Sequence, residues 1–301
     1  MSAMRQDFIK NYDWIRRSLM FEPRGHDCMS GAFLFPSTRD DCDIGILYIE
    51  VSGCLPMCGH GTIGTVTFAL ENDLVTPKTP GILNLDTPAG KVVAHYKKNG
   101  SKIETVKIYN VPSYLAEVGI IVSCPDLGEI IVDISYGGNF YAIVEPQKNY
   151  EGLDEFSVAD ILRFSPIIRD LINEEIEIIH PEDNTIKDTT HLFWASAPEQ
   201  KPSHGRGAVF YGDKAIDRSP CGTGTSARMA QLFGKGKLHI GGEYINESII
   251  GSVFKGRVEE VTQVGQASAI IPSIEGWANV TGHNKIYVDE NDPFKYGFKV
   301  K

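Results

Sequence analysis

One short pattern occurs twice in this chain and constrains its fold more than any other feature. It reads Cys-Gly-x-Gly-Thr, first at residues 58–62 and again at 221–225, so its two cysteines are 163 residues apart. A run with helix-forming character follows each copy, at 62–70 and at 227–233. A single glycine-rich corner is common, but two copies with the same cysteine position indicate a duplicated architecture with one thiol in each half.

Each copy of the pattern places a thiol at the start of a helix. The first backbone N–H groups of a helix have no intrahelical acceptor, and the helix dipole favours negative charge there. Such a corner can lower the pKa of a thiol and can hold a carboxylate. Two thiols across a cleft could act as base and acid on opposite faces of one carbon, while backbone N–H groups stabilise the charge that develops. Such a pair of thiols could invert the configuration of that carbon, and the reaction would need no cofactor.

Other readings of these residues remain open from the sequence alone. Cys58 and Cys221 could form a disulfide, and Cys54, Cys58 and His60 could ligate a metal, although a matching second pair of ligands is missing. Asp217 could simply cap a turn before Ser-Pro. The cysteines outside the two corners are expected to be ordinary small side chains: Cys28, Cys42, Cys54 and Cys124.

Composition narrows the class of protein. A chain of 301 residues is long enough for two domains. Its net charge of −10 argues against a nucleic-acid partner or an anionic membrane surface. The sequence contains neither an apolar run long enough to cross a bilayer nor the apolar core of a signal peptide near its start. We therefore expect a cytoplasmic protein with reduced thiols.

Hydrophobic periodicity predicts a mixed α and β chain, of the α+β or mixed α/β class, in which each half wraps strands around its Cys-started helix. Ser157 and Ser165 are expected to cap two short helices that end near residue 175, because Pro166 suits a first helical position. Several strands are expected from helix 224–233 to the C-terminus. The other predicted elements are a helix at 4–20 and strands at 32–35, 44–51, 83–85, 90–96, 105–111, 119–123, 129–136, 140–144, 190–195 and 207–211.

The two cysteine motifs, at full length 55–64 and 217–227, resemble those of the proline racemase family, in particular its 4-hydroxyproline 2-epimerase branch. Segments 22–27, 84–90 and 136–140 support the resemblance, which runs from about residue 5 to the end. It implies two pseudo-symmetric halves like those of diaminopimelate epimerase, each a curved sheet or barrel around a central helix, with the active site between them. The first half would comprise 1–113 and 284–301 and carry Cys58, and the second would comprise 114–283 and carry Cys221. The last strand would cross back to the first half.

The resemblance also implies roles for individual residues. Cys58 and Cys221 would be the two acid/base residues, and Asp217, with His60 nearby, would meet the ring nitrogen of the substrate. The substrate carboxylate would be held by Gly59, His60, Gly222 and Thr223. No cofactor, no metal and no macromolecular partner is implied, and the protein would be a monomer or a homodimer.

Ser30 bears on the choice of substrate. Proline racemases carry a bulky aromatic residue where Ser30 stands, and a serine leaves room for a 4-hydroxyl group. Because Cys221 is present, inversion is favoured over the elimination carried out by family members that lack the second cysteine. The resemblance thus implies inversion of trans-4-hydroxy-L-proline to cis-4-hydroxy-D-proline. The alternatives are a proline racemase and, in a different class, a non-catalytic imino-acid-binding protein.

One departure from the family pattern is visible at the start of the chain. Family members usually begin with a further segment that contains a first strand, whereas this sequence starts at the following helix. We therefore expect the first sheet to lack a strand, which would expose a sheet edge.

Overall fold

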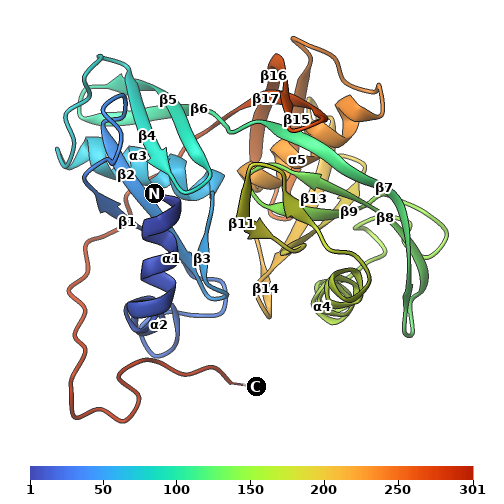
Figure 1. The fold of residues 1–301 in the computed structure, drawn as a ribbon, viewed down its shortest axis with the longest axis horizontal. Coiled ribbons are helices and arrows are strands. Elements are labelled where there is room, and N and C mark those ends of the chain that lie inside the picture. The colour runs from blue at the N-terminus through green and yellow to red at the C-terminus, as the bar shows by residue number, and fades with distance from the viewer. Residues whose placement is uncertain (301) are drawn as a thin grey trace. The chain divides into compact units, whose positions relative to one another are not determined.

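The computed structural model describes residues 1–300, which fold into two compact units (Figure 1). The first unit comprises residues 1–106, 212–215 and 277–300, and the second comprises 107–211 and 216–276. Strand β6 (Lys102–Tyr109) contains the chain's passage from the first unit into the second. Both helices and strands occur in each unit, as the sequence predicted.

The first unit is a twisted sheet with helices against it. Its strand order is β1-β2-β4-β5-β6, with β3 added beside β2, and β2 and β4 run parallel while the pairs β1–β2 and β4–β5 are antiparallel. All seven residues of β2 are buried, because α2 packs on this strand and Tyr48 reaches α3 from it. The bounds are α1 Ser2–Asn11, α2 Asp13–Met20, β1 Ser30–Phe35, β2 Ile44–Glu50, β3 Cys54–Leu55, α3 Gly59–Glu71, β4 Ile82–Thr87 and β5 Gly90–Asn99.

The second unit is a barrel closed around a helix. Among the described residues, eight strands follow one another in the order β17-β16-β15-β13-β12-β9-β8-β7, and β17 also pairs with β7, which closes the ring. Helix α5 lies within this ring and contacts β7, β8, β9, β16 and β17, whereas α4 packs against β7, β12 and β13 (Figure 1). The bounds are β7 Ser113–Cys124, β8 Gly128–Tyr136, β9 Phe140–Val144, α4 Val158–Glu175, β12 His191–Ser196, β13 Gly205–Tyr211, α5 Gly222–Gly234, β15 Glu243–Ser248, β16 Val253–Val264 and β17 Ala267–Gly276. Three short strands complete the chain: β10 Ile179–His180, β11 Asp183–Lys187 and β14 Ala215–Ile216.

The sequence of α5 explains how strands can surround it. All residues from Gly222 to Ala227 are small and buried. The turn between β8 and β9 approaches this part of the helix so closely that a Cβ on Gly137 would lie 2.2 Å from the carbonyl oxygen of Thr223. Glycine is therefore required at position 137 to bring the barrel wall against the start of α5.

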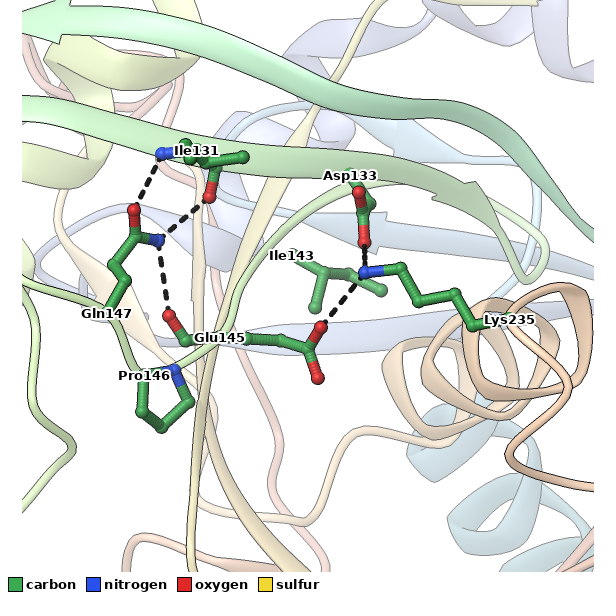
Figure 2. Close-up of a pocket in the computed structure, with 7 residues that line it drawn as sticks. All are labelled: Ile131, Asp133, Ile143, Glu145, Pro146, Gln147 and Lys235. Carbon is green, nitrogen blue, oxygen red and sulfur yellow. Dashed lines mark hydrogen bonds and ion pairs between the residues drawn. The ribbon is translucent and has the colours of Figure 1, made fainter.

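Ion pairs hold the other end of α5. The ammonium group of Lys235, which follows the last residue of the helix, lies between the carboxylates of Asp133 and Glu145 (Figure 2). Glu145 also pairs with Arg228 at 2.8 Å. A cation at a helix C-terminus is electrostatically favourable. Lys235, Asp133 and Glu145 border a pocket of about 200 Å³, together with Ile131, Ile143, Pro146 and Gln147. This network fixes the register of α5 within the barrel, and hence the position of its first turn.

Helix α4 corrects the sequence prediction of two short helices. It is continuous from Val158 to Glu175, with Pro166 inside it. Ser157 does cap the helix, through a reciprocal capping box with Asp160, but Ser165 is an interior residue whose hydroxyl accepts a hydrogen bond of 2.8 Å from Trp194 Nε1. The buried face of the helix holds it together across the proline, so packing outweighs the local preference to break.

Two further predictions were wrong at the ends of the chain. The single helix at 4–20 is two helices, α1 and α2, which meet at Tyr12. The strands expected up to the C-terminus stop at Gly276, and in the described part of 277–300 only an isolated bridge between Phe298 and Glu22 has strand-like pairing. This segment is polar and rich in turn-forming residues, and hydrogen bonds to loop 21–25 hold it in place of a strand ladder. No helix within residues 1–300 is both long and apolar enough to cross a bilayer.

Candidate active site

The first Cys-Gly-x-Gly-Thr corner begins α3, as the sequence predicted. Cys58 is the N-cap residue with an extended backbone, φ −142° and ψ 111°, and no side chain caps the helix. The residue is 7% exposed, and its Sγ lies 3.7 Å from His60 Nε2. The N–H groups of the first turn, from Gly59 on, have no acceptor within the helix. A thiol, an imidazole and a set of backbone donors therefore meet at this point.

Thr62 connects this corner to the sheet. Its hydroxyl donates to the carbonyl oxygen of Cys58 at 2.7 Å, and so it accepts from the hydroxyl of Tyr48, 2.6 Å away on β2. Burial raises the pKa of Tyr48 well above its usual range, so its proton is retained. The backbone of Cys58 is thus fixed relative to β2.

The second corner begins α5 in a strained conformation. Cys221 is the N-cap residue, with φ 59° and ψ 102°, and α5 too has no side-chain cap. Positive φ is unfavourable for a residue with a Cβ and is found where the surroundings enforce it, often at functional sites. Cys221 is 5% exposed and belongs to a buried cluster with Tyr141, Ile143 and Phe193.

Hydrogen bonds before Cys221 enforce this conformation. Its N–H donates to Ser219 Oγ at 3.0 Å, and the N–H of Ser219 donates to Asp217 Oδ1 at 2.8 Å. From the barrel wall, buried Asn246 donates to the carbonyl oxygen of Pro220 at 2.9 Å. Asp217 therefore caps a turn, one of the roles left open from the sequence, and is itself 7% exposed.

A glycine three residues after each cysteine makes room for its thiol. A Cβ on Gly61 would lie 3.0 Å from Cys58 Sγ, and a Cβ on Gly224 would lie 3.0 Å from Cys221 Sγ. These distances are shorter than ordinary van der Waals contact. The spacing that the two copies share thus has one physical meaning: each thiol lies against the first turn of its own helix.

The two thiols differ in their hydrogen-bonding partners. Cys221 Sγ lies 3.3 Å from the hydroxyl of Tyr141 on β9, and that hydroxyl lies 2.6 Å from Thr223 Oγ1. The equivalent contact of Cys58 is with His60. Burial, and then the neighbouring Cys221, raise the pKa of Tyr141 well above its usual value, so the phenol keeps its proton.

The structure distributes the predicted site residues over the two units. Cys58, Gly59 and His60 form one corner, and Asp217, Cys221, Gly222 and Thr223 form the other. Ser30 also belongs to the first unit, where it is the first residue of β1 and lies opposite Glu50. Sequence reasoning missed Tyr48 and Tyr141, whose register on β2 and β9 no local pattern reveals. The signal available for Tyr141 was its place directly after the Tyr-Gly-Gly-Asn-Phe segment.

The structure also bears on the other readings of the cysteines. None of the six cysteines, all within residues 1–300, forms a disulfide. In the same range, no group of three or more His, Cys, Asp or Glu side chains is arranged to hold a metal ion.

Comparisons with known proteins show what this chain is similar to. A protein from Shewanella loihica named 4-hydroxyproline 2-epimerase is 58% identical over 300 residues, which are 100% of this chain and 90% of the relative. The crystal structure of a probable proline racemase from Agrobacterium radiobacter, with bound carbonate, aligns over 96% of this chain and 84% of its own with a TM-score of 0.89 and 30% identity.

A second solved structure is a hydroxyproline epimerase from Agrobacterium vitis with bound trans-4-hydroxy-L-proline. It aligns over 96% of this chain and 83% of its own, with a TM-score of 0.88 and 28% identity. These matches confirm the predicted fold class. A sequence model of the family described as proline racemase matches residues 1–299. The chain therefore belongs to the proline racemase family and is an enzyme of the racemase and epimerase class.

Proposed function

We propose that this protein inverts the α-carbon of trans-4-hydroxy-L-proline to give cis-4-hydroxy-D-proline, with Cys58 and Cys221 as the acid/base pair. The observation that carries the proposal is that both thiols lie at helix N-termini and both have a glycine that clears space for the sulfur. A binding protein would need the N–H donors of the helices but would not need two thiols. The names of the relatives, and the imino acid bound to one of them, support this substrate.

The reaction needs one thiolate and one thiol. The thiolate removes the α-proton, and the opposite thiol delivers its proton to the other face of the carbon. The product has inverted configuration, and the ionisation states of the two sulfurs are exchanged. The reverse reaction starts from that exchanged state, so no cofactor is consumed. Thiolates are stabilised at helix N-termini, which favours this role for both residues.

The carboxylate of the substrate is assigned to the backbone donors. In the proposal, the first-turn N–H groups of Gly59 and His60 at one corner, and of Gly222 and Thr223 at the other, hold this carboxylate. They stabilise the negative charge that spreads onto it as the α-proton leaves. In the proposal Asp217, with His60 nearby, accepts a hydrogen bond from the ring nitrogen of the substrate.

Ser30 is assigned to substrate selectivity. A small hydroxyl side chain at this position leaves space for the 4-hydroxyl group and can exchange a hydrogen bond with it. Proline lacks that hydroxyl and would leave Ser30 unsatisfied, at a cost of about 1–3 kcal/mol. We therefore expect proline to be a slow substrate. A cytoplasmic location and a monomeric or homodimeric state stay predictions.

Proton exchange at the α-carbon tests the function. The purified protein is incubated in D2O with trans-4-hydroxy-L-proline, and in a parallel tube with L-proline, and the α-proton is followed by NMR. We expect loss of the hydroxyproline signal and appearance of the cis-D diastereomer, with much slower exchange of proline. Exchange of proline alone would show a proline racemase, and the absence of exchange in both substrates would reject both activities.

A further inference from the structure

Cys221 lies at the end of a chain of side-chain hydrogen bonds that begins at Asn139. The amide Nδ2 of Asn139 donates to Thr223 Oγ1 at 3.4 Å. Thr223 Oγ1 then lies 2.6 Å from the hydroxyl of Tyr141, which lies 3.3 Å from Cys221 Sγ. Because Thr223 accepts from Asn139, its own proton can point to Tyr141, and the proton of Tyr141 is then directed at the sulfur.

The ring of Tyr141 is held so that its hydroxyl cannot leave this position. It is fully buried in the cluster with Ile143, Phe193 and Cys221, and the imidazole of His191 lies against it with ring centroids 4.7 Å apart. His191 is fixed in turn by a 2.7 Å hydrogen bond between its Nδ1 and the hydroxyl of Thr190.

Glycine at position 224 is a second, independent observation. A Cβ there would lie 3.2 Å from Cε1 of Tyr141 as well as 3.0 Å from Cys221 Sγ. The corner is thus shaped for the phenol and the thiol together. Asp217 also acts electrostatically on Tyr141, so the titratable groups around the phenol are Asp217, His191 and Cys221.

We propose that Tyr141 is a positioning residue for Cys221: its hydroxyl, supported by Thr223 and Asn139, donates a hydrogen bond to the thiolate and accepts one from the thiol. This inference rests on the proposed function, in which Cys221 alternates between these two states. When the sulfur is ionised, the chain of donors runs from Asn139 to the sulfur. When the sulfur gains the α-proton, the hydroxyls of Tyr141 and Thr223 rotate, and the S–H donates to the phenol oxygen.

Cys58 and Cys221 would therefore carry out the same chemistry with different hydrogen-bond partners. At Cys58 the neighbouring tyrosine, Tyr48, bonds to Thr62, and the contact of the sulfur is with His60 at 3.7 Å. Removal of the Tyr141 hydroxyl should consequently change Cys221 and leave Cys58 as it was. Cys58 is a reference within the same molecule.

The test is the pH dependence of alkylation of each cysteine by iodoacetamide, resolved by mass spectrometry of the peptides. In Tyr141→Phe we expect the pKa of Cys221 to rise by about one unit, so that its alkylation at pH 7 slows about tenfold. At alkaline pH, where the thiol is ionised in both proteins, the rates should converge. Cys58 should keep its wild-type profile.

Two further variants complete the test, one as a control and one as a second probe of the hydrogen-bond chain. Tyr150→Phe removes another buried tyrosine hydroxyl of the same unit, one that donates to the backbone oxygen of Ala195 at 2.9 Å, and should leave the Cys221 profile unchanged. Thr223→Val removes the support behind the phenol and should shift Cys221 in the same direction as Tyr141→Phe, by less. Thr223→Val also tests the proposed role of Tyr141 if Tyr141→Phe does not fold.

An unchanged Cys221 profile in Tyr141→Phe or in Thr223→Val would overturn the proposal, as would slower alkylation by the same factor at every pH, which indicates a purely structural role. The pH profile of kcat/KM should shift to higher pH in Tyr141→Phe. Alkylation needs no turnover, so absence of epimerisation would reject the proposed function while the hydrogen bond to Cys221 is still measured.

Discussion

Gly224→Ala separates the positioning of a thiol from the stability of the fold. The new methyl group would lie 3.0 Å from Cys221 Sγ and 3.2 Å from Cε1 of Tyr141, so one of them must move by a few tenths of an ångström. Tyr141 is enclosed in the barrel cluster, and the backbone of Cys221 is already strained at φ 59°. We therefore expect the sulfur to be displaced.

The magnitudes for stability and activity differ. Alanine is favoured over glycine within a helix by about 1 kcal/mol, which offsets the crowding, so the free energy of unfolding should change by less than about 1 kcal/mol. A misplacement of about 1 Å in a reacting group can cost about 100-fold in rate. A shift of a few tenths of an ångström should then lower kcat/KM about tenfold, or about 1.4 kcal/mol in the activation free energy.

Gly64→Ala is the matched control. Gly64 is also a helical glycine, in α3, but a Cβ there would have no neighbour within 4 Å. This variant should be more stable by up to about 1 kcal/mol and keep the wild-type kcat/KM. Urea unfolding followed by circular dichroism measures the first quantity, and α-proton exchange in D2O measures the second. Equal kcat/KM values for the two alanine variants would refute the reasoning about thiol clearance.

Three further predictions concern the barrel and the substrate. Burial alone would raise the pKa of Glu145, but Arg228 and Lys235 hold it at about 2, so the stability it contributes is present above about pH 4.5 and is lost as the pH falls towards 2. Glu145→Gln should accordingly lower the free energy of unfolding by about 1–2 kcal/mol at pH 7. Urea titrations should show that the variant and the wild-type protein become equally stable at acidic pH. Gly137→Ala places a methyl group against the backbone of α5, and it should lower the free energy of unfolding by more than about 3 kcal/mol or prevent folding. Soluble yield and circular dichroism measure this, and a stable variant would contradict the close approach. Ser30→Phe should raise the ratio of kcat/KM for L-proline to that for 4-hydroxyproline, and an unchanged ratio would remove Ser30 from the site.

The start of each catalytic helix could be predicted because its signals are local. Cysteine and glycines at fixed offsets, followed by a helix-forming run, placed α3 and α5 to within a few residues of their observed starts at Gly59 and Gly222. The capping role of Ser157 was equally local and was confirmed.

What could not be predicted depends on contacts between distant parts of the chain. Pro166 indicates a helix start by itself, but the packing of α4 on the barrel carries the helix through it. Tyr141 and Cys221 are 80 residues apart in sequence, and they meet because the closure of the barrel brings β9 and α5 together. The strained φ of Cys221 likewise follows from bonds to Ser219 and from the position of Asn246 on β15.

The central claim is that two thiols act on one α-carbon, and Cys58→Ser and Cys221→Ser test it most directly. Each variant is incubated with trans-4-hydroxy-L-proline in D2O at a concentration at which the wild-type protein reaches equilibrium, and formation of cis-4-hydroxy-D-proline is followed by NMR. A serine hydroxyl is a far weaker acid than a thiol, so neither variant should form the product although both keep the wild-type circular dichroism spectrum. Epimerisation by either variant at near the wild-type rate would contradict the two-thiol mechanism.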